Sequence, residues 1–130
     1  MSKSGKRILC IEDDADTCEL LTTWLGLSEC VVISTSMMAT GVELARKQSF
    51  DLYLVDSRLP DGRGEEVCRR IRSFDSLTPI LFWSADDERR AAYAAGAQAF
   101  VAKPIDPLSF MQTIDDLLAR HTQQKGRCEA

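Results

Sequence analysis

The stretch DLYLVDSRLPDGRG, Asp51 to Gly64, decides the fold, because it passes from an apolar run directly into a loop rich in Pro and Gly. A short apolar run bounded by turn residues is typical of a strand that is buried on both faces. Asp56 stands at the tip of this run. A carboxylate there either starts a turn or must be reached from solvent. Which of these two explanations holds depends on which other residues lie at the same edge of the sheet that this strand joins.

Four more apolar runs surround this strand in the sequence. The five predicted strands span residues 7–11, 30–34, 51–55, 79–84 and 98–103. Amphipathic stretches that favour helices lie between and after them, at residues 15–27, 37–48, 64–74, 87–95 and 107–120. Alternation of this kind predicts an α/β fold, a three-layer sandwich in which helices cover both faces of a parallel five-stranded sheet.

Length and composition predict one domain. A chain of 130 residues with 45% hydrophobic residues can build one core but hardly two. We place the domain at residues 6–120, between a polar N-terminal extension, 1–5, and a polar segment, 121–130, that is a tail or the start of a linker. His121 lies in this polar segment, so we expect a solvated imidazole there.

Charge and apolar content bear on partners and location. The formal net charge is −4 and there is no long run of Lys or Arg, so direct binding to nucleic acid is not expected. No apolar segment suggests a signal peptide or a membrane span, which favours the cytoplasm. The five cysteines are scattered, without a C-x-x-C pair, which disfavours both zinc and a disulfide framework.

Unusual polar residues follow several of the predicted strands. Glu12 and Asp13 follow the first strand, Asp56 the third, while Ser84 and Lys103 end the fourth and fifth. The carboxyl ends of parallel strands meet at one edge of the sheet. If the first and third strands are neighbours, the three carboxylates converge. Crowded carboxylates repel unless a cation joins them, and Mg²⁺ suits such oxygen ligands.

Each of these residues also has a structural explanation when taken alone. Acids that follow a strand often cap the next helix, and Asp56 alone could be a turn-starting acid. A Lys–Pro pair is a weak signal by itself. The combination is harder to explain structurally, because it requires independent coincidences at one edge of one sheet.

From Lys6 to about Arg120 the chain resembles a receiver domain of the response regulators of bacterial two-component signalling, similar to the chemotaxis regulators. The matching segments are ILCIEDD, DLYLVDSRLPDGRG, PILFWSA and GAQAFVAKPID, in that order. The resemblance implies a flavodoxin-like (βα)5 fold with the strand order 2-1-3-4-5. It also implies a regulator that catalyses only its own phosphorylation and dephosphorylation and is not otherwise an enzyme.

The resemblance implies a role for each residue of the acidic edge. Asp56 would accept a phosphoryl group from a phosphohistidine. Asp13 would bind Mg²⁺, with Mn²⁺ as an alternative cation, Glu12 would bind it mainly through water, and the backbone carbonyl of Arg58 would be another ligand. Lys103 would neutralise charge on the phosphoryl oxygens.

The same resemblance implies a switch that carries the signal to a surface. Ser84 would be drawn to the phosphorylated Asp56 and Phe100 would turn inward, changing the surface of the fourth helix, fifth strand and fifth helix. The peptide bond between Lys103 and Pro104 would be cis. The donor would be a sensor histidine kinase or a histidine phosphotransfer protein, and the output a protein target that the sequence does not name. Dimerisation through that surface stays open.

Arg58 and Asp86 lie two residues after Asp56 and Ser84, respectively. We hypothesise that these side chains pair across the mouth of the site and hinder the water that hydrolyses the acyl phosphate. The alternative is that both are solvated loop charges.

Three other functions share parts of this pattern. A haloacid-dehalogenase-type phosphatase needs an Asp nucleophile that closes the first strand in a D-x-D pattern, together with a cap or extra residues for its substrate. Here the first predicted strand ends at Ile11 and EDD follows it. A flavodoxin needs a hydroxyl-rich phosphate loop where this chain has EDDAD, which would repel phosphate. A pseudo-receiver that acts only as an interaction module stays open, although it would not need the acidic edge intact.

Overall fold

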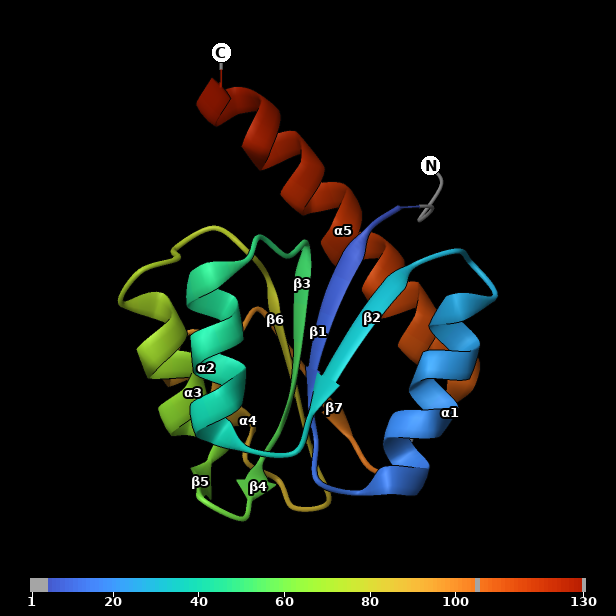
Figure 1. Cartoon of the computed structure of the whole chain (residues 1–130), viewed down its shortest axis with the longest axis vertical. Helices are drawn as coiled ribbons and strands as arrows, with labels where there is room; N and C mark the ends of the chain where they lie inside the picture. Colours follow the sequence, from blue (N-terminus) through green and yellow to red (C-terminus); the bar gives the residue numbers. More distant parts are fainter. Residues whose placement is uncertain (1–4, 105, 130) are drawn as a thin grey trace.

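A computed structural model describes residues 5–104 and 106–129 of the chain. Five parallel strands form one sheet in the order β2-β1-β3-β6-β7 (Figure 1). The strands are β1 (Arg7–Ile11), β2 (Val31–Thr35), β3 (Leu52–Asp56), β6 (Ile80–Ser84) and β7 (Ala99–Ala102). With the short strands β4 and β5 set aside, this is the predicted flavodoxin-like order 2-1-3-4-5, and the prediction is confirmed.

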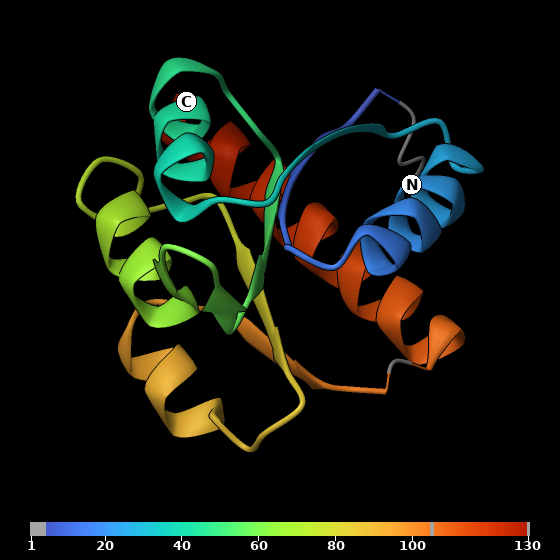
Figure 2. The ribbon, with the colours of Figure 1, turned by 60° about the horizontal axis from the view of Figure 1, so that its bottom comes forward.

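Helices cover the two faces of the sheet (Figure 2). They are α1 (Ala15–Gly26), α2 (Met38–Lys47), α3 (Gly64–Arg72), α4 (Arg89–Ala94) and α5 (Pro107–Glu129). Helices α1 and α5 lie on one face and α2, α3 and α4 on the other, which gives the predicted three layers. Most predicted helix ends agree within two residues, and the main difference is at the end of α5.

Alternate residues of each central strand enter opposite cores. In β1, Leu9 and Ile11 pack with α2 and α3, whereas Ile8 and Cys10 pack with α1 and α5. Successive side chains of a strand point to opposite faces of the sheet. Both sets are fully buried because helices cover both faces. This explains why the central strands read as continuous apolar runs rather than as alternating ones.

The prediction that His121 is solvated was wrong. Helix α5 continues past Arg120 to Glu129, and the His121 side chain is only 4% exposed. Its Nε2 atom lies 4.0 Å from Oδ1 of Asp51, the residue before the central strand β3. The polar composition of the segment did not show that one helical face of it still covers the protein.

A hairpin interrupts the loop that follows Asp56. The two short strands β4 (Arg58–Leu59) and β5 (Gly62–Arg63) pair with each other antiparallel, apart from the main sheet. The Asp61 carboxylate in the hairpin turn accepts hydrogen bonds from the amides of Met38 and Ala39, at 2.6 and 3.0 Å, and so caps α2. The hairpin is thereby held in place beside the carboxyl edge of the sheet.

Candidate functional site

Three carboxylates meet at the carboxyl edge of the sheet. Because β1 pairs with β3, the residues that follow Ile11 lie beside Asp56, the last residue of β3. One carboxylate oxygen from each of Glu12, Asp13 and Asp56 lies within 4.8 Å of the others. Glu12 and Asp56 are buried, and Asp13 is exposed. The cluster is therefore open to solvent on the side of Asp13.

Lys103 supplies positive charge to this cluster. Its Nζ atom lies 3.2 Å from Oε1 of Glu12 and 3.2 Å from Oδ1 of Asp56. The peptide bond that follows Lys103 is cis, and the ammonium also lies 5.3 Å from the centre of the Trp83 ring. Lys103, the residue after the edge strand β7, thus bridges two of the three carboxylates.

The charges of the cluster are not balanced. Burial, and next the neighbouring Asp56, raise the pKa of Glu12 from 4.5 to about 9. Burial alone would lower the pKa of Lys103, but the Glu12 and Asp56 carboxylates outweigh it and the pKa is raised. Oε2 of Glu12 is buried without a hydrogen-bond partner among the described residues. One ammonium does not neutralise three ionised carboxyl groups, which is why Glu12 holds its proton so strongly. A hard cation could take the place of that proton, so the donor set fits one.

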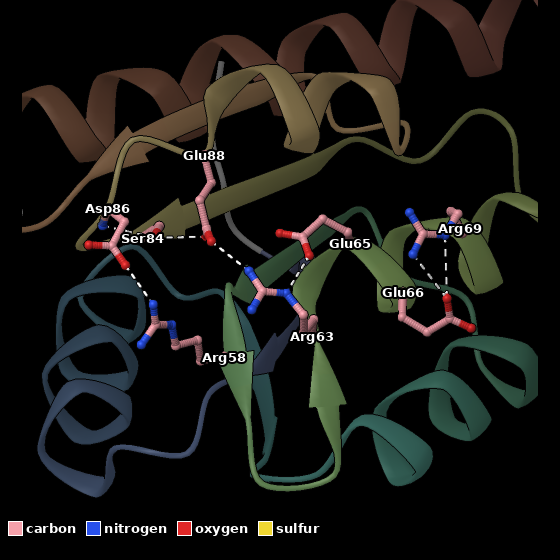
Figure 3. Close-up of polar contacts among 8 residues, drawn as sticks. All are labelled: Arg58, Arg63, Glu65, Glu66, Arg69, Ser84, Asp86 and Glu88. Atoms are coloured by element: carbon pink, nitrogen blue, oxygen red, sulfur yellow. Dashed lines mark hydrogen bonds and ion pairs between the residues drawn. The ribbon is translucent and has the colours of Figure 1, made fainter.

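Ser84 ends β6, the strand beside β3. Its hydroxyl donates to Oε2 of Glu88 at 3.0 Å and accepts from the amide of Asp86 at 3.1 Å (Figure 3). The structure gives it no hydrogen bond to Asp56. Ser84 is 1% exposed, so its hydroxyl is held by protein groups rather than by bulk solvent.

Arg58 and Asp86 pair beside the site. Nη2 of Arg58 lies 2.8 Å from Oδ2 of Asp86, linking the hairpin to the segment after β6 (Figure 3). Both side chains are well exposed, at 69% and 59%. Exposed pairs of this kind stabilise a fold little, so any importance of this one would lie in its position.

Phe100 on β7 is half-buried and already packs against the core. Its ring stacks on Phe82, with centroids 6.1 Å apart, and the guanidinium of Arg89 lies 5.1 Å from its centre. The first residue of α4 thus covers the ring, by a contact of the cation–π type.

Two residues that contact this region were missed in the sequence. Glu88 accepts from Ser84 and pairs with Arg63 of the hairpin, Nη2 to Oε1 at 2.6 Å. The only available signal was the acidic run in SADDE, which looks like a solvated loop. Nothing local to Arg63 indicates a partner more than twenty positions away in the chain.

An open parallel sheet with polar groups gathered at the carboxyl ends of its strands is the architecture of a ligand-binding or regulatory doubly wound domain. The sequence model of the response regulator receiver domain matches residues 8–115. The chain therefore belongs to the receiver-domain family of response regulators. Receiver domains are signalling regulators rather than classical enzymes, and they bind Mg²⁺ at an acidic pocket.

Curated relatives are longer than this chain. The transcriptional regulatory protein GltR of Pseudomonas aeruginosa is 33% identical over 97% of this chain and 55% of its own length. The cell cycle transcriptional regulator CtrA of Caulobacter vibrioides is 32% identical over 88% of this chain and 48% of its own length. The chain thus spans about half the length of these relatives.

Solved structures share the fold. A CheY-like receiver domain protein from Methanospirillum hungatei has a TM-score of 0.88 at 22% identity, covering 93% of this chain and 99% of its own. The receiver domain of the sensor histidine kinase PA1611 from Pseudomonas aeruginosa has a TM-score of 0.83 at 24% identity, covering 89% and 99%. The latter structure holds a magnesium ion in its active site cleft.

Proposed function

We propose that the chain is a phosphorylation-activated signalling domain that accepts a phosphoryl group from a phosphohistidine onto Asp56 in a Mg²⁺-dependent reaction. The observation that carries this proposal is the convergence of Glu12, Asp13 and Asp56 with the ammonium of Lys103. A structural ion pair would need neither a third carboxylate nor a buried carboxylate oxygen without a partner.

Mg²⁺ fits this donor set and supplies charge neutralisation for phosphoryl transfer. Asp13 and Asp56 would hold it by carboxylate oxygens, Glu12 mainly through water, and Arg58 through its backbone carbonyl. Mn²⁺ would serve as an alternative cation, because it accepts the same oxygen ligands.

The side chains divide the rest of the chemistry. An oxygen of the Asp56 carboxylate attacks phosphorus, the new O–P bond forms as the N–P bond breaks, and the electron pair of that bond returns to the donor imidazole. Lys103 neutralises charge on a phosphoryl oxygen, and the Ser84 hydroxyl donates to another. In this proposal catalysis is limited to the domain's own phosphorylation and dephosphorylation.

Incubation with acetyl phosphate tests this function. We expect one phosphoryl adduct on the wild type by intact mass, no adduct with EDTA, and no adduct on Asp56→Asn, whose amide is not a nucleophile. Glu66→Ala is the matched control, because Glu66 pairs with Arg69 and Arg70 on α3 and not with the acidic cluster. Absence of an adduct on the wild type under all conditions would favour a pseudo-receiver that acts only as an interaction module.

The proposal also defines partners. The donor is a sensor histidine kinase or a histidine phosphotransfer protein, and the output is a protein target that binds the surface of α4, β7 and α5. The signal reaches this surface through Ser84 and Phe100. The same surface is also a candidate interface for a homodimer. The net charge of −4 supports protein partners rather than direct contact with nucleic acid.

The expected location is the cytoplasm, where histidine phosphodonors act. Within the described part of the chain, no helix combines the length and the apolar character that crossing a membrane requires.

We expect Arg58→Ala to accelerate dephosphorylation. The pair of Arg58 with Asp86 covers the approach to Asp56 in this proposal, and its removal admits the hydrolytic water. Because the pair is exposed, the expected increase in rate is about twofold to fivefold. The decay of the phosphoryl adduct is followed by mass after removal of the donor. An unchanged decay rate would show that the pair is only a solvated surface contact, and Asp86→Asn should reproduce any acceleration.

A further inference from the structure

In the unphosphorylated protein the Ser84 hydroxyl already donates a hydrogen bond to a carboxylate. It donates to Oε2 of Glu88 at 3.0 Å, and its own oxygen accepts from the Asp86 amide at 3.1 Å (Figure 3). A serine hydroxyl carries one proton and donates to one acceptor at a time. Donation to Glu88 therefore excludes donation to a phosphoryl oxygen on Asp56.

Glu88 is itself held in place. Its other oxygen, Oε1, accepts from Nη2 of Arg63 at 2.6 Å, and Nε of Arg63 donates to Oε2 of Glu65 at 2.9 Å (Figure 3). The Glu88 side chain is only 15% exposed and that of Glu65 only 10%. Hydrogen bonds between ionised groups of this kind are shorter and stronger than neutral ones. The hairpin thus fixes the carboxylate that Ser84 binds.

We propose that Glu88 and Arg63 form a latch that holds the Ser84 hydroxyl away from Asp56 until phosphorylation opens it. This inference rests on the proposed function, because it concerns the regulation of the same site. On phosphorylation, Ser84 exchanges the Glu88 carboxylate for a phosphoryl oxygen, and Glu88 remains paired with Arg63. Glu88 is a positioning residue in this scheme, since it acts through Ser84 and not on the reacting atoms. The latch stabilises the unphosphorylated state and thereby makes the switch to the phosphorylated state less favourable.

The next residue connects the latch to the output surface. Glu88 immediately precedes Arg89, whose guanidinium covers the ring of Phe100 at 5.1 Å. The start of α4 therefore contacts both side chains to which the proposed function assigns the switch. Release of Ser84 from Glu88 therefore removes one contact of the segment that also holds Arg89 over Phe100.

The affinity for beryllium trifluoride tests the latch, because this probe has the geometry of a phosphoryl group on a carboxylate. It is titrated calorimetrically into the wild type and Glu88→Ala, each with saturating Mg²⁺. We expect Glu88→Ala to bind it about 10-fold more tightly, since Ser84 no longer gives up a hydrogen bond to a charged acceptor. Glu88→Gln keeps the shape but loses the charge, and should bind about threefold more tightly. Glu66→Ala, the matched control, should bind like the wild type.

A second titration in the Ser84→Ala background separates this role from a structural one. If Glu88 acts through Ser84, the gain from Glu88→Ala disappears when the hydroxyl is absent. Equal or weaker binding by both Glu88 variants, or a gain that survives in Ser84→Ala, would overturn the latch. If Glu88→Ala does not fold, as judged by circular dichroism, Glu88→Gln decides alone. Lack of binding by the wild type would instead overturn the proposed function itself, and the latch with it.

Discussion

Replacing Gly64 with alanine should lower the free energy of unfolding by about 2 kcal/mol, a cost typical of overpacking. Gly64 begins α3, and its amide donates to the carbonyl of Ser57 at 2.9 Å. A Cβ atom there would lie 2.6 Å from the backbone oxygen of Asp56 and 2.6 Å from Cε2 of Phe82. Both neighbours belong to the central strands, which are fixed on both faces, so neither can move away without cost.

The same substitution should slow phosphorylation by acetyl phosphate, because any relief of the contact displaces the backbone of Asp56. We expect a loss of about 10-fold or more, since displacements of reacting groups by an ångström carry penalties of this size. Gly26→Ala is the matched control, because Gly26 ends α1 and a Cβ there meets nothing within 4 Å. That variant should be more stable than the wild type by roughly 0.5 kcal/mol.

Urea unfolding and the initial rate of adduct formation measure the two effects. If Gly64→Ala unfolds and reacts like the wild type, the backbone around Asp56 is free to adjust, and the close packing seen between α3 and β3 does not position the acceptor. A loss of stability without a loss of rate would show that the cost is confined to the packing of Phe82.

The metal-free protein should lose stability as pH rises from about 5 to 8. Burial and the Asp56 carboxylate raise the pKa of Glu12 from 4.5 in the unfolded chain to about 9 in the folded protein. Between these values the folded state retains a proton that the unfolded state releases. The contribution of Glu12 to stability is therefore full below pH 4.5 and is lost as pH rises towards 9. The slope is at most about 1.4 kcal/mol per pH unit.

Saturating Mg²⁺ should flatten this slope, because a bound cation favours the ionised form of Glu12. The measurement is the free energy of unfolding in urea at several pH values, with EDTA or with Mg²⁺. Glu12→Gln is the control: it carries no titrating group at this position, so the difference between its curve and that of the wild type isolates Glu12. A metal-free wild type that follows Glu12→Gln across this range would contradict a raised pKa at Glu12.

The pattern of apolar runs and amphipathic stretches was sufficient to predict the sheet and its helices. Burial on two faces requires apolar residues at every strand position, and this requirement is visible in the sequence itself. The gathering of Glu12, Asp13, Asp56 and Lys103 could be predicted for a different reason, because the carboxyl ends of parallel strands meet at one edge of the sheet. The order of the strands came from the resemblance to receiver domains rather than from periodicity.

Contacts between distant segments were not predictable from the sequence. Asp61 looks like an ordinary turn acid, yet it caps the start of α2 across the fold. The segment around His121 looks like a polar tail, yet α5 continues through it and buries the imidazole.

The sequence by itself determined the five strands of the main sheet, to within one residue at each end, and the polar groups at its carboxyl edge, because these follow from local periodicity and strand direction. The tertiary structure alone decided that Ser84 donates to Glu88 and that Arg63 holds Glu88. The physical reason is that a charged side chain in a loop can pair with a distant partner only after the helices and the hairpin have packed together. Its rotamer and its burial depend on neighbours that no local pattern encodes.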